Sequence, residues 1–146
     1  MRSLSLFFAL MLFLGLSLPA SARGPQPQVV GAWVRLPVIA GRPGAAYMRI
    51  TAPHGDRLIA VSSPMARSAM IHESSMEGGV MRMDEVAGIA LPAGQSVALA
   101  PGGAHIMLFD LKPVKPGQKI LLILQFEKSG SQRVEALAQA ATAPAP

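Results

Sequence analysis

Histidine and methionine residues that lie two positions apart form the most distinctive chemical pattern of the chain. Three such pairs occur, namely His105 with Met107, Met70 with His72, and Met81 with Met83. In a β-strand, residues two apart project from the same face, so each pair can point toward one ligand. One pair alone is more often explained by core packing of methionine or by a hydrogen-bonded histidine. Because the pattern recurs, it favours a metal site.

The donor types indicate monovalent copper. The sequence has nine methionines and no cysteine, so thioether sulfur and imidazole nitrogen are its soft donors. Thioether sulfur suits Cu(I), whereas Zn(II) and Mg(II) prefer other ligands, and a blue-copper electron-transfer centre needs a cysteine thiolate. The donors therefore predict a protein that carries Cu(I) rather than one that changes the oxidation state of its copper.

Short apolar segments separated by glycine and proline make up most of the chain, a pattern typical of an all-β sandwich or barrel. The predicted strands are 29–35, 45–51, 57–62, 69–74, 80–85, 96–100, 104–111, 120–128 and 132–137. Nine strands suit two packed sheets. The three histidine and methionine pairs fall on three of these strands, which would have to be neighbours to form one site.

The N-terminus reads as an export signal. Met1 and Arg2 precede an apolar run over residues 4–18, and small residues follow at positions 20–22. We expect cleavage after about Ala22, a flexible lead-in over 23–28, one domain over 29–137 and a disordered Ala/Pro tail over 138–146. Without a cysteine for lipid attachment, no stable membrane anchor is expected after cleavage.

Charge and motif content argue against other function classes. The formal net charge is +5, but the arginines are scattered singly and no basic stripe with aromatics occurs, so nucleic-acid binding is not expected. No nucleophile elbow or triad spacing is present, so the chain is not expected to be an enzyme.

The spacing of four residues resembles a known family. His72 is followed after ten residues by Met83, after a further twenty-one by His105, and after one more by Met107. This is the H-x(10)-M-x(21)-H-x-M pattern of the periplasmic PCu(A)C copper chaperones. The segments 31–35, 44–47, 72–83 and 101–108 also resemble the family, and the resemblance covers roughly residues 29–137.

The resemblance implies a cupredoxin-like Greek-key β-barrel or sandwich with one Cu(I) site. It implies that His72, Met83, His105 and Met107 are the ligands. It further implies delivery in the periplasm toward the binuclear copper centre of cytochrome c oxidase, with oxidase subunit II and Sco-type proteins as partners. Some relatives carry a C-terminal extension rich in histidine and methionine; this tail lacks both, so a single site is expected.

The remaining candidates have simpler interpretations. Met76 and Met81 are spare ligands or packing residues, with Met81 the better spare, and Met48, Met65 and Met70 are assigned to the core. His54 is a turn residue, and Trp33 is a core anchor with a cap over the site as its less favoured role. Glu73 and Asp110 could hold an imidazole N–H, but strand alternation points both away from the ligand face.

Two other functions fit the same sequence. A periplasmic copper storage or resistance protein would have the same site but no acceptor. A secreted β-sandwich that binds only proteins would keep these methionines in its core, so exposure of the methionines together discriminates between the metal and protein-binding interpretations.

Overall fold

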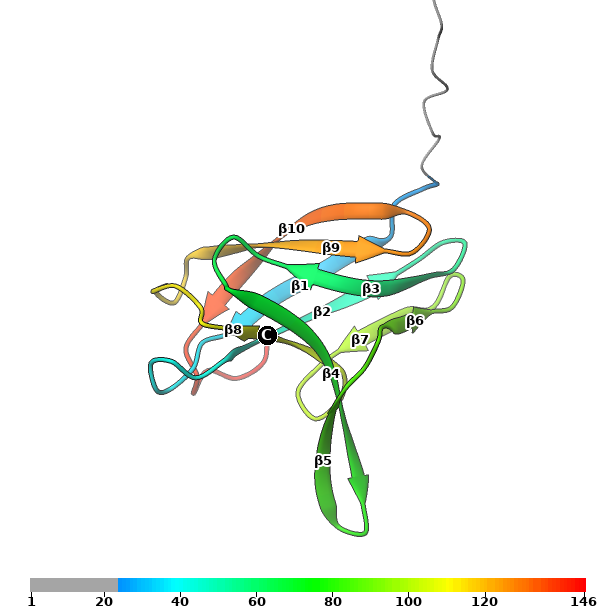
Figure 1. The fold of residues 1–146 in the computed structure, drawn as a ribbon. Helices are drawn as coiled ribbons and strands as arrows, with labels where there is room; N and C mark the ends of the chain where they lie inside the picture. The colour runs from blue at the N-terminus through cyan, green and yellow to red at the C-terminus, as the bar shows by residue number, and fades with distance from the viewer. Residues whose placement is uncertain (1–23) are drawn as a thin grey trace, which may run out of the picture.

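The computed structural model describes residues 24–146, so the predicted signal peptide over 1–22 lies outside the described residues. The described part folds into β-strands joined by turns (Figure 1). None of its segments is a helix of the length and apolarity needed to cross a membrane. The strands are β1 Gln28–Arg35, β2 Gly44–Thr51, β3 Asp56–Ser62, β4 Ser68–Glu77, β5 Val80–Glu85, β6 Ile89–Leu91, β7 Ser96–Leu99, β8 His105–Phe109, β9 Lys119–Phe126 and β10 Gly130–Gln139.

Hydrogen bonding joins all ten strands into one sheet. The order is β5-β4-β8-β2-β1-β10-β9-β3-β6, and β7 pairs with β2 beside β8. The sheet curls over itself, because Ile71 of β4 and Leu58 of β3, which are far apart in this order, share one core cluster. The expected two packed sheets are therefore the two sides of one continuous hydrogen-bonded sheet.

Alternating apolar residues hold the curled sheet together. In β9, Ile120, Leu122, Leu124 and Phe126 are fully buried while the residues between them are only partly covered. Such period-two burial is the pattern of a strand with one face on the core. Burying each of these side chains contributes roughly 1.5–3 kcal/mol to folding.

The sequence prediction missed one short strand and ended the last strand too early. β6 was not predicted, because its three residues are too short to show an alternating pattern. β10 continues to Gln139, past the predicted strand end at Leu137 and into the predicted disordered tail. Ala138 is 1% exposed and pairs with Val34 of the parallel strand β1, so the start of that tail is part of the sheet.

A bulge in β1 reverses which side chains face the core. The pairing with β2 shifts register between Val30 and Trp33, and Gly31 adopts φ 61° there, a conformation that favours glycine. Before the bulge Val29 packs toward the core, and after it Val34 does. Trp33 and Arg35 consequently project from the opposite side of the sheet, the side that carries the candidate site.

The β4–β5 hairpin extends away from the body of the molecule (Figure 1). Glu77 pairs with Val80, so Gly78 and Gly79 form a two-residue turn, with φ 57° and 80°. Positive φ at both positions is what a tight hairpin turn of type I′ requires, and glycine adopts it without steric cost. All residues of β5 are exposed, so this hairpin is held by its own pairing.

Candidate metal centre

The three predicted pairs do lie on neighbouring strands. β4 is hydrogen-bonded to β5 on one side and to β8 on the other. Ile71 of β4 pairs with Ile106 of β8, and both are buried in the core. Their neighbours along each strand therefore project from the outer face, where His72 and Met70 meet β8.

The two histidines lie directly opposite each other. His72 pairs with His105 across β4 and β8, and their ring centroids are 5.8 Å apart at an interplanar angle of 47°. Directly opposite residues on one face have Cβ atoms about 4.5–5.5 Å apart, close enough for two imidazoles to share one ion. This pair forms the centre of the candidate site.

His105 is held in one tautomer by the backbone. It is 4% exposed, and its Nδ1 lies 2.9 Å from the carbonyl oxygen of Gly103. A carbonyl only accepts hydrogen bonds, so Nδ1 carries the proton and Nε2 keeps a free lone pair. The same carbonyl accepts the Ser74 backbone N–H at 3.2 Å, which ties the turn before β8 to β4. His105 is thus oriented to donate Nε2 to a metal.

His72 has no partner for either ring nitrogen. Both Nδ1 and Nε2 are buried and make no hydrogen bond. A buried polar atom left unpaired costs about 1–3 kcal/mol, so such atoms call for an explanation. A metal ion held between His72 and His105 would pair one of these two nitrogens, so the residues present fit a metal.

Met107 and Met83 border the histidine pair on the same face. Met107 follows His105 by two residues in β8 and pairs with Met70 of β4. Met83 of β5 pairs with Ser74 and is therefore the diagonal neighbour of His72. Diagonal neighbours in a sheet lie about 7–8 Å apart, within reach of a long side chain such as methionine. The structure thus brings the four predicted residues together on one face.

Trp33, Tyr47 and Arg35 form a wall beside His105. The Tyr47 ring lies 6.3 Å from the His105 ring and 4.6 Å from the Trp33 ring. The Arg35 guanidinium stands 5.1 Å from the centre of the Trp33 ring. Burial raises the pKa of the Tyr47 phenol above its usual range, and the nearby Arg35 charge partly opposes this. The phenol therefore stays neutral beside the site.

Comparison with known proteins decides the family. A family model described as "Putative lipoprotein LpqE-like" matches residues 28–138. The chain belongs to the LpqE-like family. A relative from Leifsonia xyli subsp. xyli (strain CTCB07), named "Putative lipoprotein Lxx21020", is 36% identical over 133 residues, which cover 80% of this chain and 75% of the relative.

Solved structures similar to this LpqE-like protein are copper-binding PCuAC domains. The copper-bound PCuAC domain from PmoF2 matches with TM-score 0.66 and 29% identity, covering 80% of this chain and 94% of that one. Apo-DR1885 from Deinococcus radiodurans matches with TM-score 0.61 and 25% identity, covering 95% of each chain. DR1885 is also known in its Cu(I) form. The predicted all-β, cupredoxin-like fold is thereby confirmed.

Several residues outside the four-residue pattern lie differently from their predicted positions in this LpqE-like fold. Met48 is in the core as predicted, and Met65 packs against it, but Met70 is 37% exposed on the site face, so its core assignment is wrong. Trp33 is buried but is not part of the core cluster; it belongs to the wall beside His105.

Carboxylates contribute little to this centre. Glu73 pairs with Asp84 on the other face of the hairpin, and Asp110 forms an ion pair with Arg67. Glu85, which sequence reasoning did not consider, pairs with His72, and no hydrogen bond joins the two side chains. Within residues 24–146 no group of three or more His, Cys, Asp or Glu side chains could hold a metal.

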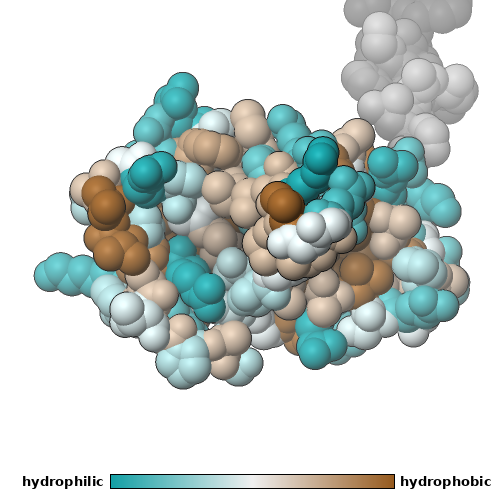
Figure 2. All heavy atoms as spheres, turned by 90° about the horizontal axis from the view of Figure 1, so that it is seen from below, coloured by the Kyte–Doolittle hydropathy of each residue, from teal (hydrophilic) through white to brown (hydrophobic). Residues whose placement is uncertain are grey.

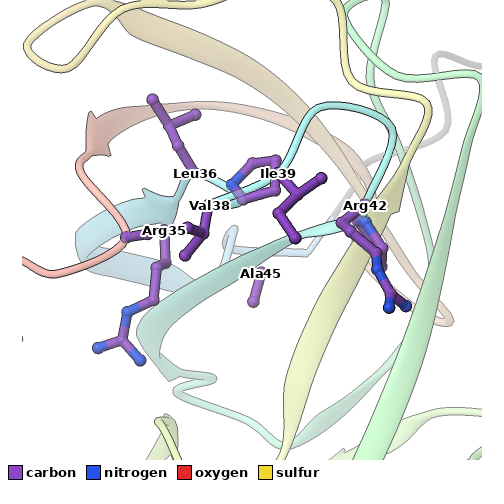
Figure 3. A pocket seen from close by; sticks show the side chains of 9 residues that line it. Arg35, Leu36, Val38, Ile39, Arg42 and Ala45 are labelled. Atoms are coloured by element: carbon purple, nitrogen blue, oxygen red, sulfur yellow. The ribbon is translucent and has the colours of Figure 1, made fainter.

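A pocket of about 330 Å³ adjoins the site face in this LpqE-like protein. Arg35 and Arg42 border it with Ala45 between them (Figure 3), and Ala45 pairs with Met107. The loop beside it exposes Val38 and Ile39, which are 82% and 64% exposed. Figure 2 shows strongly apolar atoms at this left-hand edge of the molecule. An apolar surface therefore lies next to Met107.

Proposed function

We propose that this protein is a periplasmic copper chaperone that holds Cu(I) with His72, His105, Met83 and Met107. The observation that carries the proposal is the buried, unpartnered imidazole of His72 opposite His105. Two thioethers on the same face complete a set of four neutral donors. The PCuAC domains to which the chain is similar include copper-bound and Cu(I)-bound forms, which supports copper as the cargo.

Neutral soft donors favour Cu(I) over the dication. Imidazole and thioether add no charge to offset a second positive charge on the metal, and thioether sulfur matches the softer ion. The absence of a carboxylate-rich cluster among the described residues supports the same choice. The centre is accordingly suited to carrying copper in one oxidation state.

The four ligands differ in exposure, which gives transfer a direction. Met83 is 49% exposed on the projecting hairpin, whereas His105 is 4% exposed and held by the Gly103 carbonyl. A donor group of an acceptor protein reaches Met83 first and displaces its thioether. His105 is the last ligand to release the ion. Copper thus leaves by stepwise ligand exchange from the hairpin side.

We infer that the acceptor is a copper site of the respiratory chain. The family pattern supports delivery toward the binuclear centre of cytochrome c oxidase, with oxidase subunit II and Sco-type proteins as partners. Export is supported by the leader-like residues at the N-terminus and by a relative and a family model that are both described as putative lipoproteins. In a storage or resistance protein the same ion would be held without an acceptor.

The binding proposal is tested by anaerobic titration of the purified protein with Cu(I) against a chromophoric chelator. We expect one tight equivalent that is lost or much weakened in Met83→Ala and in His105→Ala. His54→Ala is the matched control, because His54 lies in the turn before β3 and belongs to another pocket. Binding that is indifferent to both site substitutions would refute the proposal.

Delivery is tested by adding copper-loaded protein to a copper-free soluble domain of oxidase subunit II. Two transferred Cu(I) ions give a colourless, fully reduced centre, so a one-electron oxidant such as ferricyanide is added after transfer. Appearance of the absorption of the mixed-valence binuclear centre is then the expected result. Tight binding without transfer would favour storage instead.

A further inference from the structure

The outer part of the β4–β5 hairpin carries a cluster of three methionines, of which only Met83 belongs to the four-ligand site. Met76 of β4 pairs directly with Met81 of β5, and Met83 follows Met81 by two residues on the same face. Their side chains are 65%, 59% and 49% exposed. Three thioethers therefore line one exposed face toward the hairpin tip.

Packing does not account for these methionines. None of them belongs to the core cluster or packs against it, and the whole of β5 is exposed. Methionine stabilises a protein by filling its interior, and exposed apolar surface gains nothing from folding. The three side chains therefore do not serve stability in the protein alone.

The two faces of the hairpin have different chemistry. Opposite the methionines lie charged residues, and Arg82 forms an ion pair with Glu77 at 3.0 Å. Glu73 and Asp84 pair with each other on this charged face. Figure 2, which views the molecule from below and so faces the hairpin end-on, shows hydrophobic and hydrophilic residues side by side on it. Strand alternation places Arg82 and Glu77 on the face opposite the methionines. Glu85 lies beyond Met83, next to His72.

We propose that Met76, Met81 and Met83 form a second, thioether-only site for a soft monovalent ion, Cu(I), on the hairpin. Opposite residues have Cβ atoms about 4.5–5.5 Å apart, and diagonal ones lie within reach of long side chains. Each methionine has three rotatable bonds, so the sulfur atoms can converge on one ion. Neutral sulfur donors select Cu(I) over harder ions.

Met83 connects this site to the histidine pair. It is a neighbour of Met81 on one side and the diagonal neighbour of His72 on the other. An ion bound at Met76 and Met81 can exchange onto Met83 and then onto the imidazoles, keeping its single charge throughout. This direction of movement rests on the proposed function, whereas binding at the hairpin does not.

The experiment follows methionine methyl groups by NMR in protein labelled at the methyl carbon. Ag(I) serves as the probe, because it has the softness and charge of Cu(I) and does not change oxidation state. In a His72→Ala/His105→Ala variant, we expect the Met76 and Met81 methyl signals to shift together with one equivalent of Ag(I). In the wild type, the first equivalent of Ag(I) engages Met83 in the four-ligand site. The Met76 and Met81 signals are therefore expected to shift only with a second equivalent, which these two thioethers hold more weakly.

Met76→Leu/Met81→Leu removes the sulfur atoms and keeps the apolar volume. We expect this variant to lose the equivalent of Ag(I) bound at the hairpin and to keep the one bound at the histidine pair. The control variant Met65→Leu, which lies outside the hairpin, is expected to keep both equivalents. An unchanged amide spectrum reports that the fold is intact. The inference is overturned if the methyl signals of Met76 and Met81 do not shift when Ag(I) is added. It is also overturned if the Met76→Leu/Met81→Leu variant binds as many equivalents of Ag(I) as the wild type.

Failure of the two proposals can be told apart. Hairpin binding without any histidine-dependent equivalent refutes the four-ligand site and leaves the hairpin site standing. If the Met76→Leu/Met81→Leu variant binds Ag(I) normally but transfers copper poorly, the methionines serve as a docking surface and the proposed hairpin site is overturned.

Discussion

The two histidines of the candidate centre are supported very differently by the protein around them. His105 donates Nδ1–H to the Gly103 carbonyl and lies against the Tyr47 ring. His72 has two buried nitrogens without a partner. His105 therefore contributes to the stability of the metal-free protein, whereas His72 lowers it and gains its partner when a metal binds.

This difference predicts opposite effects on stability for two similar substitutions. His72→Leu is expected to raise the free energy of unfolding of the metal-free protein by about 1 kcal/mol, because it removes an unsatisfied buried group. His105→Leu is expected to lower it by about 1 kcal/mol, because a hydrogen bond is lost and the Gly103 carbonyl loses a donor. Urea unfolding in metal-free buffer measures both.

Adding Cu(I) to the same samples provides the control. A ligand that binds the folded state stabilises the protein, so the wild type gains stability and both variants lose that gain. A metal-free His72→Leu variant that is clearly less stable than the wild type would show that His72 has a structural role.

At the scale of elements, the β4–β5 hairpin positions Met83 through a turn that only glycine fits well. Gly79 adopts φ 80°, and no heavy atom lies within 4 Å of where a Cβ would be, so backbone conformation alone disfavours other residues. A left-handed residue other than glycine costs about 1–2 kcal/mol. An exposed two-stranded hairpin has little stability to spare.

Gly79→Ala is therefore expected to fray the hairpin and weaken Cu(I) binding, with little change in the unfolding of the core. Amide hydrogen exchange along β5 measures the fraying, and chelator competition measures the affinity. Ser75→Ala, in the same hairpin without a turn constraint, is the control. If hydrogen exchange in β5 is unchanged but Cu(I) binding is weaker, fraying of the hairpin is not the cause of the weaker binding and the prediction is wrong.

Sequence patterns anticipated most strands but not how they meet. The alternation of β9 and the glycines after Glu77 were readable, because both are local. Placement of β4 between β5 and β8, and the parallel pairing of Trp33 with Leu137, depend on contacts distant in sequence. Trp33 is buried as expected of a core anchor, but the bulge at Gly31 places it outside the main core cluster, where it packs against Tyr47.

For the candidate site, the same-face pairs followed from strand alternation, and the grouping of the four residues followed from the family spacing. A cap over the site was only the less favoured role of Trp33, and the wall that it forms with Arg35 and Tyr47 was not predicted. That wall depends on the bulge and on the pairing between β1 and β2. Glu85 was missed for the same reason, since its position opposite His72 is set by hairpin register.

At the scale of the whole molecule, one carboxylate fastens the start of β3 to the turn between β9 and β10. Asp56 accepts hydrogen bonds from the backbone N–H groups of Arg57 at 2.7 Å, Lys128 at 2.9 Å and Ser129 at 3.0 Å, and from the Ser129 hydroxyl. Lys128 and Ser129 lie more than seventy residues away in sequence. Gln26 also donates to the Ser129 carbonyl, so the lead-in joins this cluster.

These bonds predict how stability depends on pH. Burial alone would raise the pKa of Asp56, but the donors from Ser129, Lys128 and Arg57 outweigh it and hold the pKa below its usual range. Because the folded pKa is the lower one, the ionised group contributes its full stability above the unfolded value of about 3.9. That contribution disappears as the pH falls through the folded pKa.

Asp56→Asn is accordingly expected to lower the free energy of unfolding at pH 7 by about 1–2 kcal/mol, because charged acceptors form the stronger hydrogen bonds. The gap to the wild type should narrow as the pH falls below about 4, where the wild-type carboxyl also becomes protonated. Urea unfolding at a series of pH values measures the gap. Glu127→Gln, which alters an exposed carboxylate at the end of β9, should leave stability nearly unchanged. A gap of constant size from pH 7 to pH 3 would mean that Asp56 acts through its shape rather than its charge, and that the junction between β3 and the β9–β10 turn does not depend on ionisation.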